Sequence, residues 1–463
     1  MNIISTKDSA KKKVLLIAYH FPPDSAVGGL RIAKFARYLP YFDWEPTVLT
    51  VEDRFRHQLD MERLKDLGGT KIVKTPQLPT LTKSLLSIKR MVPMFLKKRK
   101  MAETEHEDLY GENPGYSRAE TFLQKLKRYY LSLSSFPDGE RCWVIPAARQ
   151  AIKEIKQVRF DCIMTSSPPH SSHLIGLIVK KCSNVKWIAD FRDPWIDVLP
   201  NRSSLVRSAL SDKNENWLEK LVIRNADKII TTTDEHRKVI ASRFPHEPPK
   251  KFVYIPNGID SEKFNNSLPE RYDKFTISYV GTIYLKRTPE PIFKAIQELV
   301  HSNKIRPDEI RFKLIGDCGL IDGKPTASIA RAHGLEKIVE VSGPVPYMDA
   351  ITVMQRSHLL VLLATAIQNI NIPAKIYDYF GSGTKIIAIS EHGATSRLIE
   401  STKSGECFKP SDIDGIAEYI FQLMTNKNRD SFRNNPSFYA QFDTKLLAGK
   451  LAEQFSSLRK FSV

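Results

Sequence analysis

Charged side chains follow an apolar segment in the stretch WIADFRDPWID, where they could act on a substrate. Asp190, Arg192 and Asp193 stand where the apolar run KWIADF ends. A carboxylate at this position could orient a substrate hydroxyl or stabilise positive charge at a reacting carbon. The alternative is a structural ion pair between an aspartate and the arginine. A catalytic role for these three residues is therefore a hypothesis.

Basic residues after a glycine form a second candidate site. In YVGTIYLKRTPEP, Gly281 ends an apolar segment, and Lys286 and Arg287 follow before a helix. Fixed cations there suit a diphosphate, because a guanidinium can bind phosphate oxygens in bidentate fashion. Further along, Lys375 and Asp378 lie one helical turn apart and could hold a sugar ring, or ribose hydroxyls and a phosphate. Exposed basic residues and an ordinary surface pair are the alternatives.

Small residues occupy the turns of two predicted strand–turn–helix units. Gly28 and Gly29 in HFPPDSAVGGLR precede one helix, and Ala394 and Thr395 in HGATSRLIE begin another. Backbone N–H groups at a helix start, together with the helix dipole, favour a phosphate or carboxylate. The pattern G-x-G-x-x-G is absent, so the dinucleotide fingerprint is not met. A tight turn without a ligand is the alternative at the two glycines.

The sequence predicts neither a metal site nor another cofactor. His170 and His173 in SSPPHSSHLIG are three residues apart, but a third ligand is not evident, and capping or packing explains them equally well. The five cysteines are scattered without a C-x-x-C pair, which favours a reducing compartment without structural zinc. The D-x-D in SDID precedes a helix, where Asp412 is better explained as the N-cap.

Short apolar segments alternate with amphipathic helical patterns, and this rhythm occurs twice along the 463 residues. Near-continuous apolar runs suit parallel strands buried on both faces, so the chain is predicted to be α/β with two doubly wound sheets. Ligands of such sheets bind at the carboxyl ends of the strands, here in a cleft between two domains. The predicted strands are 14–19, 46–51, 71–75, 162–167, 186–191 and 228–233, then 276–281, 311–316, 338–343, 359–364 and 385–390.

The formal net charge of +18 favours anionic partners. Residues 83–100 are basic and amphipathic, and could contact an anionic membrane surface; a solvated helix is the alternative. No apolar run approaches the ~18 residues of a membrane span, and the N-terminus lacks a signal-peptide pattern. We expect a cytoplasmic protein, either soluble or peripheral on the inner face of the membrane. Nucleic acid is not a predicted partner, because no recognised binding module is present.

Eight stretches, taken in order, resemble the family-4 GT-B glycosyltransferases, most closely the bacterial branch that makes surface polysaccharides. They are YHFPPDSAVGGLRIAKFARYL, SSPPHSSHLIG, ADFRDPW, ADKIITTT, IPNGID, VGTIYLKRTPEP, IPAKIYDYFGSGTKIIAI and GATSRLIE. The resemblance implies a GT-B fold, in which two Rossmann-like domains face a central cleft. It places the acceptor-binding domain at 1–250, the nucleotide-sugar domain at 251–435, and a C-terminal helix within 436–463 that packs back on the first domain.

The resemblance also implies an activity. A sugar would move with retention from a UDP- or GDP-sugar to a lipid-linked or polysaccharide acceptor, in capsule or lipopolysaccharide synthesis, without a metal. Arg287, with Lys286, would contact the diphosphate, and Asp378 would hold the ribose. The resemblance also implies that Lys375 lies beside the donor, that Gly28 and Gly29 approach the donor across the cleft, and that Asn257 lies at the interdomain crossover. Gly281 at its strand end, and Ala394 and Thr395 at their helix start, are donor-binding residues predicted from the strand–turn–helix pattern.

Two departures from the family pattern concern the donor site. Ile370 occupies the first position of the E-x7-E pattern, whose second position is Asp378, so the usual sugar contact is in doubt. Thr282 stands where many relatives place an arginine, which leaves more of the phosphate charge to Arg287. A GT-B-like sugar-nucleotide epimerase and a non-catalytic scaffold that binds glycan or lipid are the alternative functions.

Overall fold

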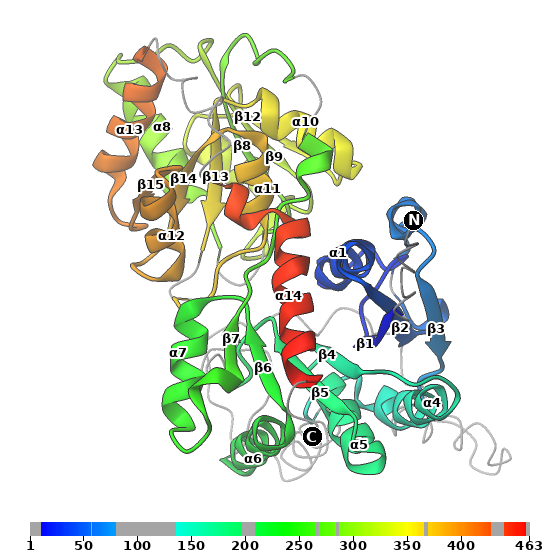
Figure 1. Cartoon of the computed structure of the whole chain (residues 1–463). Helices are drawn as coiled ribbons and strands as arrows, with labels where there is room; N and C mark the ends of the chain where they lie inside the picture. Colours follow the sequence, from blue (N-terminus) through cyan, green and yellow to red (C-terminus); the bar gives the residue numbers. More distant parts are fainter. Residues whose placement is uncertain are drawn as a thin grey trace, which may run out of the picture.

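Two parallel sheets, each in its own α/β domain, dominate the molecule (Figure 1). The computed structural model describes 11–56, 58–79, 136–196, 209–264, 268–283, 287–364, 369–426 and 439–459. Residues 83–100, for which a membrane contact was predicted, and Lys286 lie outside the described residues.

Seven strands form the first sheet in the order β3-β2-β1-β4-β5-β6-β7, and all of its pairs are parallel. The chain order reverses between β1 and β4, and a crevice for ligands is expected at such a switch point. The strands are β1 (Lys12–Ala18), β2 (Trp44–Val51), β3 (Lys71–Thr75), β4 (Cys162–Ser167), β5 (Lys186–Phe191), β6 (Lys228–Thr231) and β7 (Phe252–Tyr254).

Six strands form the second sheet in the order β12-β9-β8-β13-β14-β15, again all parallel. Its switch point lies between β8 and β13. A two-stranded antiparallel hairpin of β10 (Leu320–Ile321) and β11 (Lys324–Pro325) stands apart from it. The six strands are β8 (Phe275–Val280), β9 (Ile310–Ile315), β12 (Val339–Ser342), β13 (Leu359–Leu363), β14 (Lys385–Ile389) and β15 (Gly405–Phe408).

Each of the predicted strands is present, and the prediction of a GT-B fold with two Rossmann-like domains is confirmed. Three strands have the predicted bounds: Lys71–Thr75, Cys162–Ser167 and Lys186–Phe191. The prediction missed β7 and β15, which lie at one edge of their sheets, and the two hairpin strands β10 and β11. These strands have two to four residues each, too few for the long apolar run on which the prediction depended.

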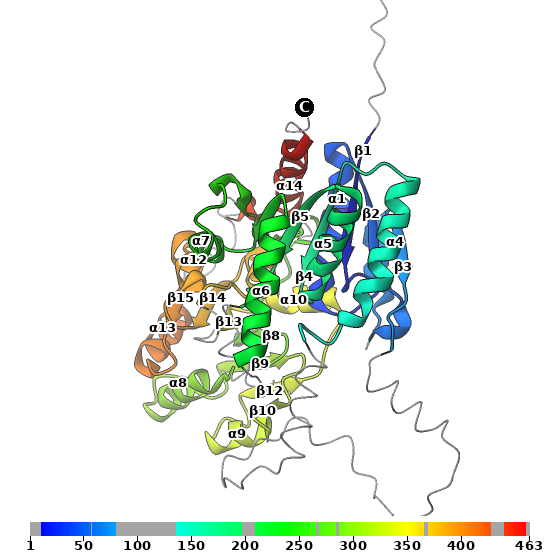
Figure 2. The same ribbon diagram turned by 90° about the horizontal axis from the view of Figure 1, so that it is seen from below.

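Helices cover both faces of each sheet. In the first domain α4, α5 and α6 lie on one face (Figure 2), while α1 and α14 pack on the other. The helices are α1 (Leu30–Tyr38), α4 (Val144–Gln157), α5 (Ser171–Ser183), α6 (Ala209–Asn225), α7 (Asp234–Arg243), α8 (Glu290–His301), α9 (Thr326–Ala332), α10 (Tyr347–Arg356), α11 (Lys375–Ser382), α12 (Ala394–Thr402), α13 (Ile413–Thr425) and α14 (Thr444–Arg459).

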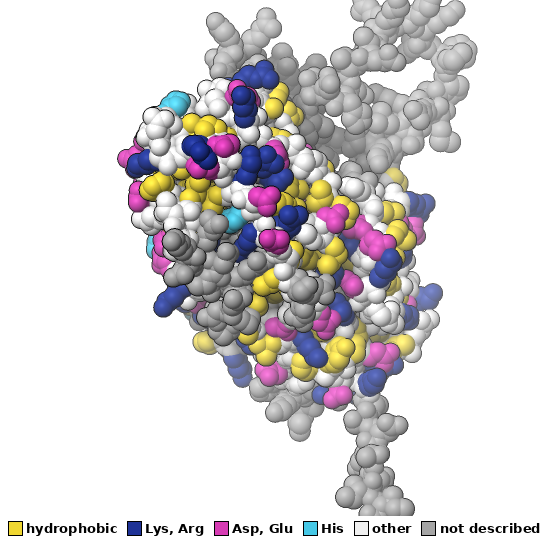
Figure 3. Space-filling model, turned by 90° about the horizontal axis from the view of Figure 1, so that it is seen from above, with side chains coloured by type: hydrophobic (Ala, Val, Ile, Leu, Met, Phe, Trp, Pro, Cys, Tyr) yellow, Lys and Arg dark blue, Asp and Glu magenta, His cyan; other side chains and the backbone are white. Residues whose placement is uncertain are grey.

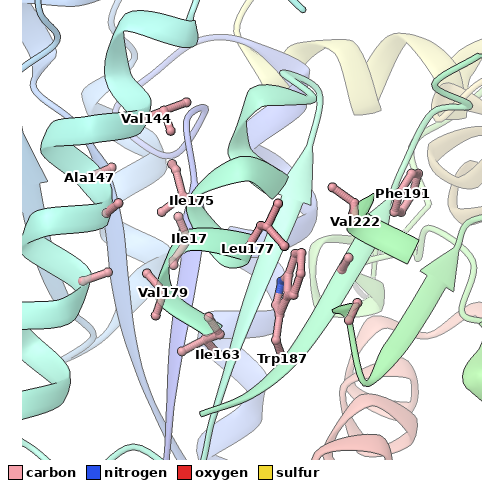
Figure 4. Packing of buried hydrophobic residues seen from close by; sticks show 14 of the residues in the cluster. Ile17, Val144, Ala147, Ile163, Ile175, Leu177, Val179, Trp187, Phe191 and Val222 are labelled. Atoms are coloured by element: carbon pink, nitrogen blue, oxygen red, sulfur yellow. The ribbon is translucent and has the colours of Figure 1, made fainter. Parts of the chain in front are cut away.

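The core beneath α4, α5 and α6 is closely packed (Figure 4). Ile17, Ile163 and Trp187 project from three neighbouring strands toward the helices. The Trp187 ring lies directly against the backbone of Gly176 in α5, where a Cβ would come within 2.3 Å of the ring. Close packing of this kind fixes the position of β5, whose carboxyl end carries the residues predicted to act on a substrate.

The last helix, α14, crosses from the second domain and lies against the first (red in Figure 1). Its residues Leu447, Leu451 and Phe455 are fully or almost fully buried with residues of β1 and α1. Beside it the chain passes between the domains a second time: the Ile259 N–H donates to the Phe442 carbonyl, at 2.8 Å. The two domains are therefore joined by two adjacent segments of chain.

The domain boundaries of the prediction can be placed on this architecture. The limit after residue 250 falls just before β7, which pairs with β6 in the first sheet. The first passage between the domains follows β7, from Ile255 onward, and reaches β8 at Phe275. Residue 435, the predicted end of the second domain, lies outside the described residues.

The face shown in Figure 3 mixes Lys and Arg side chains with Asp, Glu and hydrophobic ones. On this face, basic and acidic side chains lie among each other. Within the described residues, helices are either too short or too polar to cross a membrane.

Candidate active site

Two cations meet at the switch point of the second sheet. Arg287 follows β8, and Lys375 begins α11 after β13, the neighbouring strand. Lys375 is largely buried, and its Nζ lies 3.9 Å from the centroid of the Tyr279 ring. Burial, together with the positive charge of Arg287, lowers the pKa of Lys375 to about 7. A site that concentrates positive charge in this way is suited to an anion.

Gly281 provides the space that Lys375 occupies. Its φ of +132° is a conformation that side-chain-bearing residues rarely adopt. A Cβ at Gly281 would lie 2.5 Å from Lys375 Nζ. The structure therefore shows that Gly281 leaves space for Lys375 at the end of β8, while its predicted part in donor binding stays a prediction.

Asp378 lies one turn after Lys375 and faces the first domain. The Tyr347 hydroxyl donates to Asp378 Oδ1 at 2.9 Å. Burial raises the pKa of the Asp378 carboxyl, while the positive charge of Lys34 from α1 acts in the opposite direction. Lys34 itself donates to the Gly258 carbonyl at 3.0 Å. Asp378 therefore lies where α1 and α11 approach the segment that passes from the first domain to the second between Ile255 and Phe275, here called the interdomain crossover.

The start of α12 is less open than predicted. The Ala394 N–H donates to the Asn369 carbonyl at 2.6 Å, so this donor is already used. The Thr395 hydroxyl donates to the Asn371 carbonyl at 3.3 Å. The sheet order places β13 between β8 and β14, so the helix that starts beside Arg287 is α11. The expected phosphate contact of Ala394 is not supported, because the loop before α11 folds over the start of α12.

Asp190 is committed to a buried ion pair. Arg31 Nε and Nη2 donate to its two carboxylate oxygens, each at 3.2 Å, and Ser166 Oγ donates to Oδ2 at 2.8 Å. Arg31 also donates to the carbonyls of Ile255 and Pro256, at 2.8 and 2.6 Å. This geometry favours the structural alternative for Asp190, with Arg31 as partner in place of Arg192. The pair ties β4, β5 and α1 to the crossover.

Arg192 and Asp193 follow β5 with different surroundings. Arg192 donates through Nη1 to the Gly28 carbonyl. A Cβ at Gly28 would lie 3.2 Å from Arg192 Nη2, and one at Gly29 would lie 3.0 Å from the Phe21 backbone. The two glycines thus make room for other parts of the protein. Asp193 is exposed, so of the three residues predicted to be catalytic it is the one open to a ligand.

His170 and His173 are packed as rings rather than placed in the cleft. His170 stacks on Trp195 with 4.9 Å between ring centroids, and His173 stacks on Phe191 at 4.5 Å. Burial lowers the pKa of His173 to about 3, so its ring is neutral. In the part of the chain that the structure describes, His, Cys, Asp and Glu form no group of three that could hold a metal ion. Packing, one of the two alternatives, accounts for both rings.

A cavity of about 340 Å³ lies at the opposite end of α11 from Lys375, next to the interdomain crossover. It does not coincide with the predicted donor site. Its lining is formed by Ile259, Ser261, Phe264, Gly381, Tyr439, Ala440 and Asp443.

Two family models match adjacent parts of the chain. The model for glycosyl transferases group 1 matches residues 260–441, and that for glycosyltransferase family 4 matches residues 111–263. Together they extend from the first domain through the second. The chain belongs to the family-4 type of GT-B glycosyltransferases. The resemblance inferred from sequence motifs is therefore confirmed.

This glycosyltransferase is distantly similar to curated relatives. A D-inositol 3-phosphate glycosyltransferase of Kribbella flavida is 20% identical over 219 residues, which are 45% of this chain and 50% of the relative. The chain thus spans about half the length of that relative. The similarity supports the family without identifying a substrate.

Solved structures share the fold at low sequence identity. A glycosyltransferase from Rickettsia africae covers 98% of this chain and all of its own, with a TM-score of 0.59 and 13% identity. The lipopolysaccharide outer core galactosyltransferase WaaB has a TM-score of 0.55 and 14% identity, over 97% and 100% of the two chains. A UDP-N-acetylglucosamine 2-epimerase from Listeria monocytogenes has a TM-score of 0.54 and 11% identity, over 98% of each.

Sequence reasoning missed several residues that shape the site of this glycosyltransferase. Arg31 and Lys34 lie on one face of the predicted helix after the glycine turn, so their spacing was a usable signal. Tyr279 and Tyr347 gave no signal, because their partners are distant in sequence. Asp412, by contrast, is the N-cap of α13, as predicted, and accepts from the Gly415 N–H at 3.1 Å.

Proposed function

We propose that this glycosyltransferase moves a hexose from a UDP- or GDP-sugar to a lipid-linked or polysaccharide acceptor, with retention of configuration and without a metal. The product would be a bacterial cell-surface glycan, such as capsule or lipopolysaccharide. The observation that carries the proposal is the pair of cations, Arg287 and Lys375, at the switch point of the second sheet. A cytoplasmic site at the inner face of the membrane would suit a lipid-linked acceptor.

The cations would act on the leaving group. Negative charge grows on the outer phosphate of the donor as its bond to the sugar breaks, and preorganised cations stabilise that charge. Arg287, aided by Lys286 from outside the described residues, and Lys375 would supply this stabilisation in place of a metal. Asp378 would accept from the ribose hydroxyls, as the family resemblance implies. The first turn of α12 at Thr395 could add backbone donors.

Acceptor positioning is assigned to the first domain. Asp193 is exposed after β5, where it could accept a hydrogen bond from an acceptor hydroxyl. Arg192 would hold the glycine turn that faces it, through its bond to the Gly28 carbonyl. Asp190, with Arg31, is a positioning pair for the crossover in this scheme and does not contact substrate.

A donor screen tests the proposal. Melting temperatures would be measured with a panel of UDP- and GDP-sugars, because a ligand that binds only the native state raises the Tm. At 100 times its Kd, the true donor should stabilise the protein by about 2.7 kcal/mol. Arg287→Ala should abolish most of this shift and lower the transfer rate by about 100-fold or more. The exposed Lys294→Ala in α8 serves as control and should change neither measurement.

Product analysis separates the alternatives. Transfer to a lipid-linked acceptor, with the anomeric configuration read by NMR and the rate compared with and without EDTA, would support the proposed reaction. An altered nucleotide-sugar formed without any acceptor would instead indicate an epimerase. A protein that binds glycan or lipid but turns over no nucleotide-sugar, with Arg287→Ala unchanged, would be a non-catalytic scaffold.

A further inference from the structure

The ammonium group of Lys375 lacks the contacts that a buried charge normally has. Its Nζ is buried and has no hydrogen-bond partner among the described residues. An ammonium carries three N–H donors, and leaving such a group unpaired away from water is costly. Replacement by an apolar side chain would remove that cost. A lysine at this position is therefore not explained by stability alone.

Among the residues that the structure describes, the groups that face Lys375 come from three elements, and none of them supplies a negative charge to the ammonium. β8 supplies the Tyr279 ring, the segment before α8 supplies Arg287, and the segment after β9 supplies Cys318. Arg287 disfavours the charged lysine, whereas Cys318 and the face of the Tyr279 ring favour it without supplying a formal negative charge near pH 7. The pKa of the Cys318 thiol is itself raised to about 12 by burial, so this thiol is neutral near pH 7. Asp317 acts on Cys318 and does not pair with the lysine.

The position of the lysine is fixed from both sides. The Tyr279 hydroxyl donates to the Thr282 carbonyl at 2.7 Å, which holds the ring beneath Nζ. On the other side Gly281 lacks the Cβ that would displace Nζ. The ammonium is thereby directed to the carboxyl ends of β8 and β13, which is where a ligand of this sheet is expected to bind.

We infer that Lys375 couples donor binding to proton uptake: the diphosphate of the nucleotide-sugar supplies the missing anion, and Lys375 enters the complex as an ammonium. The proton comes from the solvent and is released again when the nucleotide leaves. This inference rests on the proposed function. It makes Lys375 a donor-binding residue whose contribution depends on pH.

The expected number of protons taken up on donor binding follows from the pKa of about 7 for Lys375 in the free protein. About half of the molecules carry a neutral amine at pH 7, and about nine-tenths do so at pH 8. A neighbouring diphosphate raises the pKa of the lysine, so nearly all bound molecules carry the ammonium. Donor binding should then take up about 0.5 proton at pH 7 and about 0.9 at pH 8. Above pH 8 the donor Kd should rise about tenfold per pH unit.

Titration calorimetry with UDP-glucose and GDP-mannose as probes measures this uptake. At pH 8, the binding heat would be compared in buffers with different ionisation enthalpies, and the slope gives the number of protons. The diphosphate diester of these probes has no phosphate proton to release at this pH. The wild-type protein should take up about 0.9 proton with whichever probe binds, and the control Lys294→Met should take up the same number.

Two variants distinguish a titrating lysine from a structural one. Lys375→Met should bind more weakly and take up no proton, while its Tm without ligand should not fall, because a buried polar group without a hydrogen-bond partner has been removed. Lys375→Arg keeps a permanent charge and should also take up no proton. Proton uptake that persists in Lys375→Met, or wild-type binding without uptake, would overturn the inference. Failure of the wild type to bind either probe, or any other nucleotide-sugar, would instead overturn the proposed donor.

Discussion

At the scale of single residues, the pair of Arg31 and Asp190 shows how a charged motif can serve position rather than chemistry. Asp190 is fully buried and Arg31 nearly so, and both carboxylate oxygens accept hydrogen bonds. Arg31 extends the pair to the backbone of the crossover. The pair therefore sets how the first sheet meets the segment that leads to the second domain.

Asp190→Asn should destabilise the protein by about 3 kcal/mol, because it leaves the buried Arg31 guanidinium facing a neutral amide. Urea unfolding, monitored by tryptophan fluorescence, measures this change. The exposed Asp193→Asn, three residues later, should stay within about 0.5 kcal/mol of the wild type. Native stability combined with lost transfer in Asp190→Asn would restore the catalytic hypothesis for Asp190.

At the scale of elements, the sequence predicted those features that neighbouring residues determine, and it did not predict contacts between residues far apart in the chain. Strands such as Leu359–Leu363 are apolar and buried along their whole length, so the apolar run marks their position. Arg287 and Lys375, which each follow such a strand, were predicted as site residues, and the structure places the two near each other. Contacts across many residues gave no such signal. Arg31 meets Asp190 across 159 positions, and Ala394 meets a loop that folds back over its helix.

The packing of the last helix, α14, can be tested by two substitutions. Leu451 of α14 is fully buried against the first domain, while Leu446 on the same helix is 47% exposed. Leu451→Ala should lower the free energy of unfolding by about 2 to 5 kcal/mol, through lost burial and a cavity. Leu446→Ala should change it by no more than about 0.5 kcal/mol. Equal effects of the two substitutions would mean that α14 does not contribute to the core of the first domain.

At the scale of the whole molecule, ion pairs formed by different elements join the domains. Arg37 of α1 pairs with Asp260 of the crossover at 3.2 Å, and Arg397 of α12 pairs with Glu235 of α7 at 2.8 Å. Between these, α14 belongs to the first core but follows the second domain in the chain. Unfolding of the first domain therefore releases the packing of α14 and the contacts that orient the second domain.

Acid should destabilise the first domain of the protein, because two of its histidines are buried in neutral form. Burial lowers the pKa values of His173 and His236 to about 3, against about 6.5 in the unfolded chain. Between these values the unfolded state binds up to two more protons, so the stability present above pH 6.5 is lost as the pH falls. Around pH 5 the loss should approach about 2.7 kcal/mol per pH unit from these two rings.

Urea unfolding curves at pH 7, 6 and 5 test this prediction. In the variant His236→Gln only His173 remains, so the histidine contribution to the slope should fall to about 1.4 kcal/mol per pH unit. The exposed His246, beyond the end of α7, provides the matched control, and His246→Gln should keep the wild-type slope. A wild-type slope in His236→Gln would mean that this ring is already protonated in the folded protein or open to water. The acid sensitivity would then have to come from other groups of the first domain.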